Sequence, residues 1–77
     1  MVTSQTVISR EVRQFMATTS STQSDIARLI GLDQTAVSRR LLGRAHWSLD
    51  DLDALRDAGV PLALTTYSVF DSEAVGV

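Results

Sequence analysis

Four polar side chains in the middle of the chain have the chemistry to contact base pairs: Gln34, Thr35, Ser38 and Arg39. In a helix, with 100° per residue, these four residues lie on the side opposite Val37 or next to that side. Glutamine can pair with adenine, arginine with guanine O6 and N7, and threonine offers a hydroxyl and a methyl group. The pattern therefore predicts base contacts, first from Gln34 and Thr35 at the helix start, although a solvated helix surface carries the same residue types.

Three residues flanking these four are candidates for phosphate contacts: Gln23, Arg44 and His46. We expect Gln23 to open the preceding helix, where its amide and the backbone N–H groups can meet a phosphate. Arg44 and His46 follow the candidate base-contacting segment and form a basic exit loop. For His46, a solvent-exposed loop position is the alternative.

The charge of the chain is unevenly distributed. The net charge is −2, but residues 23–47 carry +2, residues 1–22 carry +1 and residues 48–77 carry −5. The overall acidity argues against a general polyanion binder, whereas the positive part coincides with the candidate contact residues. We expect the acidic second half to weaken binding to random DNA and to leave specificity to base contacts.

Composition argues against several other classes. The chain has no cysteine and one histidine, so it offers no disulfide, no thiolate metal site and no histidine cluster. The carboxylates of residues 50–57 are interpreted as a solvated face, and we expect no catalytic residue, metal or cofactor. No apolar stretch approaches the roughly 20 residues of a membrane span, so the expected location is the cytoplasm, without membrane association.

The elements that must position these residues are short helices. Apolar residues at helical spacing predict a first helix over residues 5–18: Ile8, Val12, Phe15 and Met16. The hydroxyl run 18–22 breaks it, and either Ser21 or Thr22 caps a second helix. We expect Ile26, Leu29 and Ile30 to face inward there, and Gly31 to end that helix with a positive φ.

Two further helices follow. Asp33 is placed to cap a third helix over residues 34–42, with Ala36, Val37 and Leu41 facing inward. The fourth begins at the capping box of Ser48 and Asp51, with Trp47 and Leu52 spaced as a hydrophobic staple. Its expected core residues are Leu49, Leu52 and Leu55, and Gly59 and Pro61 end it.

The spacing within the second and third helices is typical of a helix-turn-helix motif. Counted from Gln23, the turn glycine and the small and apolar residues occupy positions 4, 5, 8, 9, 10 and 15: Ile26, Ala27, Ile30, Gly31, Leu32 and Val37. With "DIARLIGL", "QTAVSRRLLGR" and "WSLDDLDAL", the chain resembles the Cro/repressor-type (XRE-like) helix-turn-helix DNA-binding family over about residues 5–60. One departure is Arg40, where many members carry an aliphatic residue; it is interpreted either as a phosphate contact or as the partner of an acid on the fourth helix.

The resemblance implies a sequence-specific regulator of transcription that binds double-stranded DNA. By likeness to phage Cro and immunity repressors, it would act in a bacterial cell or phage-infected host as a homodimer that occludes a promoter at an inverted-repeat operator. Two alternatives stay open: a protein-interaction module such as an antitoxin, and an architectural or recombination-directionality factor.

We therefore expect an all-α fold, a compact bundle of four or five helices containing the helix-turn-helix. Residues 1–60 form the DNA-binding domain, and residues 61–77 form a C-terminal segment that could instead hold a protein partner. Alternation over residues 62–70 predicts a strand that pairs with a second subunit; a fifth helix is the competing interpretation.

Overall fold

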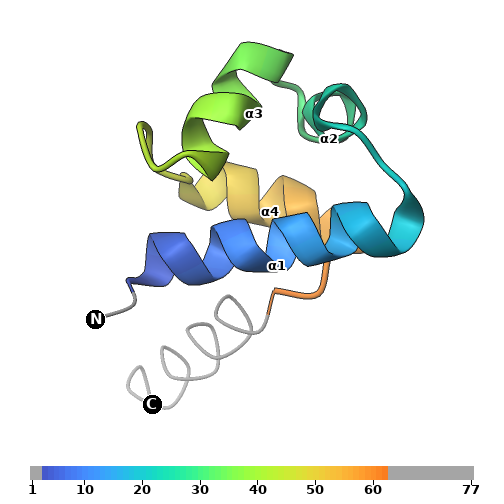
Figure 1. Cartoon of the computed structure of the whole chain (residues 1–77), viewed down its shortest axis with the longest axis horizontal. Helices are drawn as coiled ribbons and strands as arrows, with labels where there is room; N and C mark the ends of the chain where they lie inside the picture. Colours follow the sequence, from blue (N-terminus) through green and yellow to red (C-terminus); the bar gives the residue numbers. More distant parts are fainter. Residues whose placement is uncertain (1–2, 63–77) are drawn as a thin grey trace.

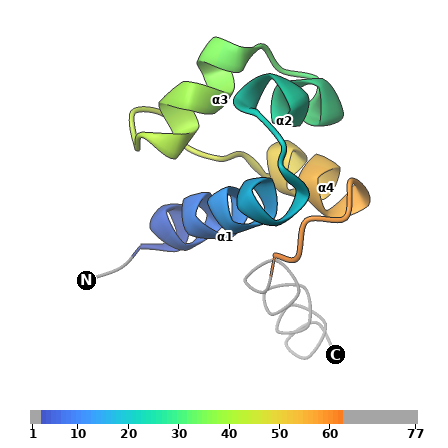
Figure 2. The same ribbon diagram turned by 45° about the vertical axis from the view of Figure 1, so that its right-hand side comes forward.

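The structure, a computed structural model, describes residues 3–62. This part of the chain contains four helices. They are α1 (Ser4–Thr19), α2 (Gln23–Ile30), α3 (Gln34–Leu41) and α4 (Leu49–Asp57). In two views turned by 45°, α2 and α3 lie above α1 and α4 (Figures 1 and 2). The expected all-helical fold is confirmed for these residues, whereas the strand or fifth helix expected over residues 62–70 lies outside them from residue 63 onward.

Each helix begins at a polar residue whose side chain accepts a hydrogen bond from the first turn. Thr22, rather than Ser21, caps α2 and forms a capping box with Asp25, and Ser48 and Asp51 form the capping box of α4. Asp33 accepts from the Ala36 N–H at 2.8 Å and caps α3. Thr3 caps α1 in the same way, and such caps contribute about 1 kcal/mol each, so all four helix starts follow from local sequence.

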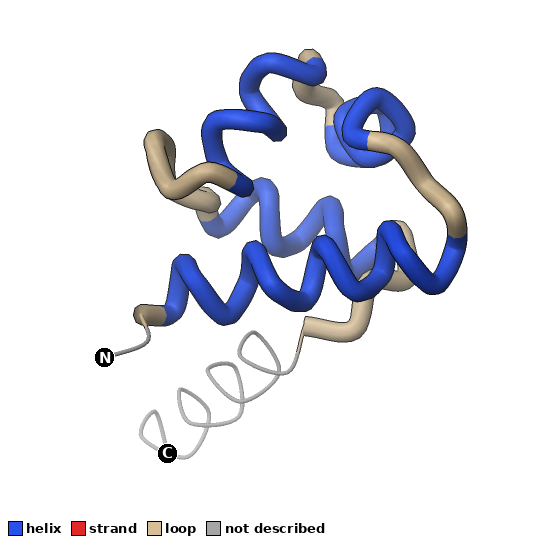
Figure 3. Tube along the Cα trace, in the orientation of Figure 1, coloured by secondary structure: helices blue, strands red, loops and turns tan. Residues whose placement is uncertain are grey.

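The connections between the helices are short (Figure 3). Gly31 closes α2 with φ of 74°, and its N–H donates to the carbonyl of Ala27, as does the N–H of Leu32 at 2.9 Å. A residue with a Cβ would meet no atom within 4 Å there, so the left-handed backbone itself is what favours glycine. This turn allows α3 to begin only four residues after α2 ends.

The core draws on all four helices and on the segments that follow α3 and α4. Its buried members are Ile8, Val12, Ile26, Ala27, Val37, Leu41, Trp47, Leu55, Val60 and Leu62. Phe15, Met16, Ile30, Leu32 and Leu52 pack against this set. One apolar core therefore stabilises α2, α3 and α4, which have only 8, 8 and 9 residues and are too short to be stable alone.

Two leucines expected in the core are exposed, so those predictions were wrong. Leu29 is 49% exposed because α2 turns Ile26 and Ala27 inward. Leu49 is 79% exposed because the buried side of α4 is defined by Asp51 and Leu55, four residues apart. In both helices the apolar spacing is compatible with two rotations of the helix about its axis. In the observed rotation the small Ala27 faces inward on α2 and the polar Asp51 faces inward on α4.

The capping box of α2 carries a pH dependence. The Thr22 backbone N–H donates to the Asp25 carboxylate at 2.9 Å, and Arg28 forms an ion pair with it. The hydrogen bond from the Thr22 backbone, followed by that from Arg28, lowers the pKa of Asp25 below its ordinary value of 3.8. The carboxylate therefore stabilises the folded state above the unfolded pKa, and this contribution is lost as pH falls through the folded pKa.

We expect Asp25→Asn to lower the Tm at pH 7, because the amide keeps the size of the side chain but not its charge. As pH falls below 3.8 the gap to the unmodified protein should narrow, since the unfolded state then binds a proton that folded Asp25 takes up only at its lower pKa. Thermal melts followed by circular dichroism at a series of pH values measure this gap. A gap that stays constant into the acid range would show that the charge of Asp25 contributes nothing.

Candidate nucleic-acid interface

One side of α3 faces solvent, and the four candidate base-contacting residues lie on it. Gln34, Thr35 and Arg39 are exposed, and Ser38 is half-buried between them. On the opposite side Val37 is fully buried. Leu42, the residue that ends α3, continues the outward side and is 62% exposed. The structure thus brings Gln34, Thr35, Ser38 and Arg39 together on one helix face, as the 100° spacing predicted.

The starts of α2 and α3 lie close together. Ser24 on α2 donates to the Gln34 amide oxygen at 3.5 Å, a long contact that links the first turns of the two helices. Gln23, the first residue of α2, is half-buried beside Ser24. The Asp25 carboxylate stands in the same turn, with its charge balanced by Arg28. A phosphate near Gln23 would therefore meet helix N–H groups beside a neutralised carboxylate.

The loop that leaves α3 folds back onto the end of the helix. The backbone N–H groups of Arg44 and Ala45 both donate to the carbonyl of Arg39, at 2.8 and 3.3 Å. Arg44 and His46 are exposed in this loop. The predicted phosphate-contacting residues consequently occupy both ends of α3, with Gln23 beside its start and the other two beyond its end.

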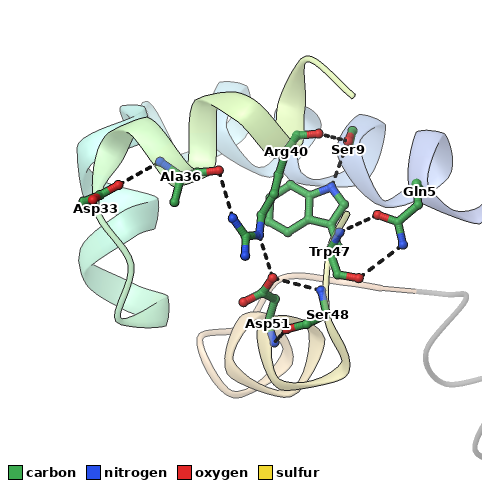
Figure 4. Close-up of polar contacts among 8 residues, drawn as sticks. All are labelled: Gln5, Ser9, Asp33, Ala36, Arg40, Trp47, Ser48 and Asp51. Atoms are coloured by element: carbon green, nitrogen blue, oxygen red, sulfur yellow. Dashed lines mark hydrogen bonds and ion pairs between the residues drawn. The ribbon is translucent and has the colours of Figure 1, made fainter. Parts of the chain in front are cut away.

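Arg40 is a structural residue and does not face the outward side of α3 (Figure 4). Its Nε donates to Asp51 Oδ2 at 2.7 Å, and one terminal nitrogen donates to the Ala36 carbonyl at 3.1 Å. The two side chains of this ion pair are only 18% and 7% exposed. Of the two interpretations of Arg40, the pairing with an acid of α4 is therefore the one observed. Asp51 is buried, so the interpretation of the carboxylates of residues 50–57 as a solvated face was wrong for this residue.

Polar residues of α1 hold the end of α3 and the loop after it. Trp47 is buried, and its indole N–H donates to Ser9 Oγ at 2.9 Å, while Ser9 Oγ donates to the Arg40 carbonyl at 3.2 Å (Figure 4). The Gln5 side chain accepts from the Trp47 N–H and donates to its carbonyl. Arg13 donates to the Leu41 carbonyl at 2.9 Å. These part-buried contacts on one side thus fix the orientation of the exposed face on the other.

Sequence reasoning missed these three α1 residues as supports of the site. Gln5, Ser9 and Arg13 are spaced by four residues and therefore share one side of α1. That spacing is visible in the sequence, but their partners lie 28 to 42 residues away along the chain. The periodicity could have identified a polar stripe, whereas its function depends on where α3 packs.

Two arginines near the exposed face have no carboxylate partner within the described part of the chain. The ion pairs there join Arg28 to Asp25, Arg40 to Asp51 and Arg56 to Asp53. Arg39 and Arg44 belong to none of them. Because Leu55 of α4 is in the same core as Val37, the acidic helix lies on the inward side of α3, away from these two cations.

Comparison with known proteins adds nothing to this geometry. No protein-family model, curated protein or solved structure matches the chain. Among residues 3–62, no three histidine or acidic side chains come together as a metal-binding group. No helix within that range combines the length and the apolar character needed to cross a bilayer.

Proposed function

We propose that the protein is a sequence-specific double-stranded DNA-binding regulator, in which α2, the Gly31 turn and α3 form a helix-turn-helix. The observation that carries this proposal is the outward face of α3, where Gln34, Thr35, Ser38 and Arg39 are presented together. A helix of about 10–12 Å diameter fits the major groove, which is about 12 Å wide. In that position, α3 would be the recognition helix.

The surroundings of α3 support a duplex as the ligand. Base contacts specify a sequence, but phosphate contacts on both sides must fix the register of the helix in the groove. Gln23 at the start of α2 and the exit loop with Arg44 and His46 provide donors at the two ends of α3. The ion pair of Arg40 with Asp51 and the anchoring of Trp47 keep the outward face in one orientation.

By its resemblance to phage-type repressors, the chain is proposed to act in the cytoplasm as a homodimer on an inverted repeat. Promoter occlusion is the corresponding mechanism of repression. Two recognition helices related by a two-fold axis would enter successive major grooves about 34 Å apart.

Arg39→Ala tests the recognition face directly. We expect each lost contact to cost about 1–3 kcal/mol on the preferred duplex, about 5- to 150-fold in Kd, with relaxed preference at one base pair of each half-site. Binding to random duplex should change much less. Kd values on both duplexes at a fixed salt concentration measure the difference.

The matched control is Arg56→Ala, which removes the same charge from α4, where Arg56 pairs with Asp53. It should leave the base preference unchanged. Equal losses for Arg39→Ala on the preferred and random duplexes would make Arg39 a phosphate contact and would remove it from the recognition face.

A further inference from the structure

A groove runs between the first half of α1 and the loop that leaves α3. Among the residues that line it are Arg10, Arg13, Leu42 and His46. Arg40 also lines it, but its charge is balanced by Asp51. No carboxylate lines this groove within the part of the chain described, so its electrostatic character is positive in a protein whose net charge is −2.

The two α1 arginines are arranged to act together. Arg10 and Arg13 are three residues apart, so they are neighbours on one side of the helix, and both are exposed. Arg13 uses one terminal nitrogen to bind the Leu41 carbonyl, which orients its guanidinium and leaves other N–H donors available. Glu11 points elsewhere and lines a separate hollow with Gln14 and Pro61. The two guanidinium groups therefore line the groove together, and Glu11, next to Arg10 in sequence, is not among its lining residues.

The groove is continuous with the outward face of α3. Leu42 ends α3 on the side that carries Ser38, and it also lines the groove. His46, one of the residues expected to contact phosphate, is a second shared member. A strand of the duplex that passes the end of α3 would therefore reach α1 without crossing an acidic surface.

We propose that this groove binds a phosphate group of the DNA backbone, with Arg10 and Arg13 as its donors. The inference rests on the proposed function, because the duplex is the source of the phosphate. Guanidinium groups are suited to this ligand since their N–H donors match phosphate oxygens in pairs. Helix α1 then becomes a third element of the interface, which positions the duplex without reading its sequence.

Arg10→Gln tests this assignment, because the Arg10 side chain has no hydrogen bond or ion pair within residues 3–62 that the fold would lose. Each phosphate contact contributes about 0.9 to the slope of log K against log salt. In the proposed homodimer the substitution removes one contact from each protomer, so we expect Arg10→Gln to reduce the slope by about 1.8. The affinity ratio of the unmodified protein to the variant should fall about 12-fold between about 50 and about 200 mM salt.

Two controls accompany the variant. Arg10→Lys should keep the slope, because a lysine still displaces one counterion. Arg56→Gln makes the same charge change on α4 and should also leave the slope unaltered. The base preference should be the same for all of these variants.

The outcomes separate the groove from the proposed function. An unchanged slope for Arg10→Gln, in a protein that still prefers one sequence, would overturn the role of the groove alone. Absence of any preferred sequence in the unmodified protein would overturn the proposed function.

A second measurement identifies the source of the phosphate. Inorganic phosphate is titrated into the full chain without DNA, and the side-chain NMR signal of Arg10 is followed. Saturation at submillimolar phosphate would assign the groove to a free phosphorylated ligand and overturn the duplex assignment. A weak, unsaturated response supports the duplex backbone as the ligand.

Discussion

Asp51→Asn is expected to lower the free energy of unfolding by about 3–5 kcal/mol, because it leaves a largely buried arginine without its counter-charge. The Arg40 side chain is 18% exposed, and its Nε donates to Asp51 at 2.7 Å. Asparagine keeps the size of the side chain and can still accept from the Ser48 N–H, which Asp51 binds at 2.9 Å. The expected loss therefore reflects the charge. Urea unfolding followed by circular dichroism measures it.

The neighbouring substitution Asp50→Asn provides the control for Asp51→Asn. Asp50 lies in the same first turn of α4 but is exposed, so its loss should change stability by no more than about 0.5 kcal/mol. If Asp51→Asn cost no more than Asp50→Asn, the ion pair would behave as a solvated surface pair, and the structural assignment of Arg40 would be wrong.

Trp47→Ala is expected to cost about 3–5 kcal/mol, as for other large side chains removed from a core. Trp47 is 4% exposed and belongs to the same buried cluster as residues of all four helices. Without Trp47, Ser9 Oγ would also lose the hydrogen bond that the indole N–H donates to it. Circular dichroism is the suitable measurement, because Trp47 is the only tryptophan in the chain and fluorescence would lose its probe.

Trp47→Phe separates packing from hydrogen bonding at the same position. Phenylalanine fills most of the volume but lacks the indole N–H, so it should cost much less than alanine. Equal losses for the two variants would mean that the hydrogen bond to Ser9, and not the packing of the ring, holds the loop after α3.

Much of the fold follows from signals that act within four residues. Thr22 with Asp25, Asp33 with Ala36, and Ser48 with Asp51 mark helix starts through side chain to backbone hydrogen bonds. Gly31 marks the end of α2 because its backbone adopts φ of 74°. Such signals are readable in a sequence because both partners are neighbours in the chain.

The rest depends on how the helices pack. Leu29 and Leu49 fitted the apolar spacing, yet the neighbouring helices contact other sides of α2 and α4. The sequence left two interpretations of Arg40, and the choice depended on the position of Asp51, eleven residues away. By contrast, the outward face of α3 could be predicted from helical spacing alone. The groove with Arg10 could not, because it exists only where α1 lies beside the end of α3.

Selection from a random pool of duplex DNA, at about 100 mM salt and with the salt dependence of the enriched sequences recorded, tests the central claim most directly. If α3 reads the major groove in a homodimer, an inverted repeat should be enriched, with half-site centres about 10 base pairs apart. Arg39→Ala should relax one position in each half-site. No enriched sequence, with only weak and salt-sensitive binding, would contradict the account and would favour a protein partner as the ligand.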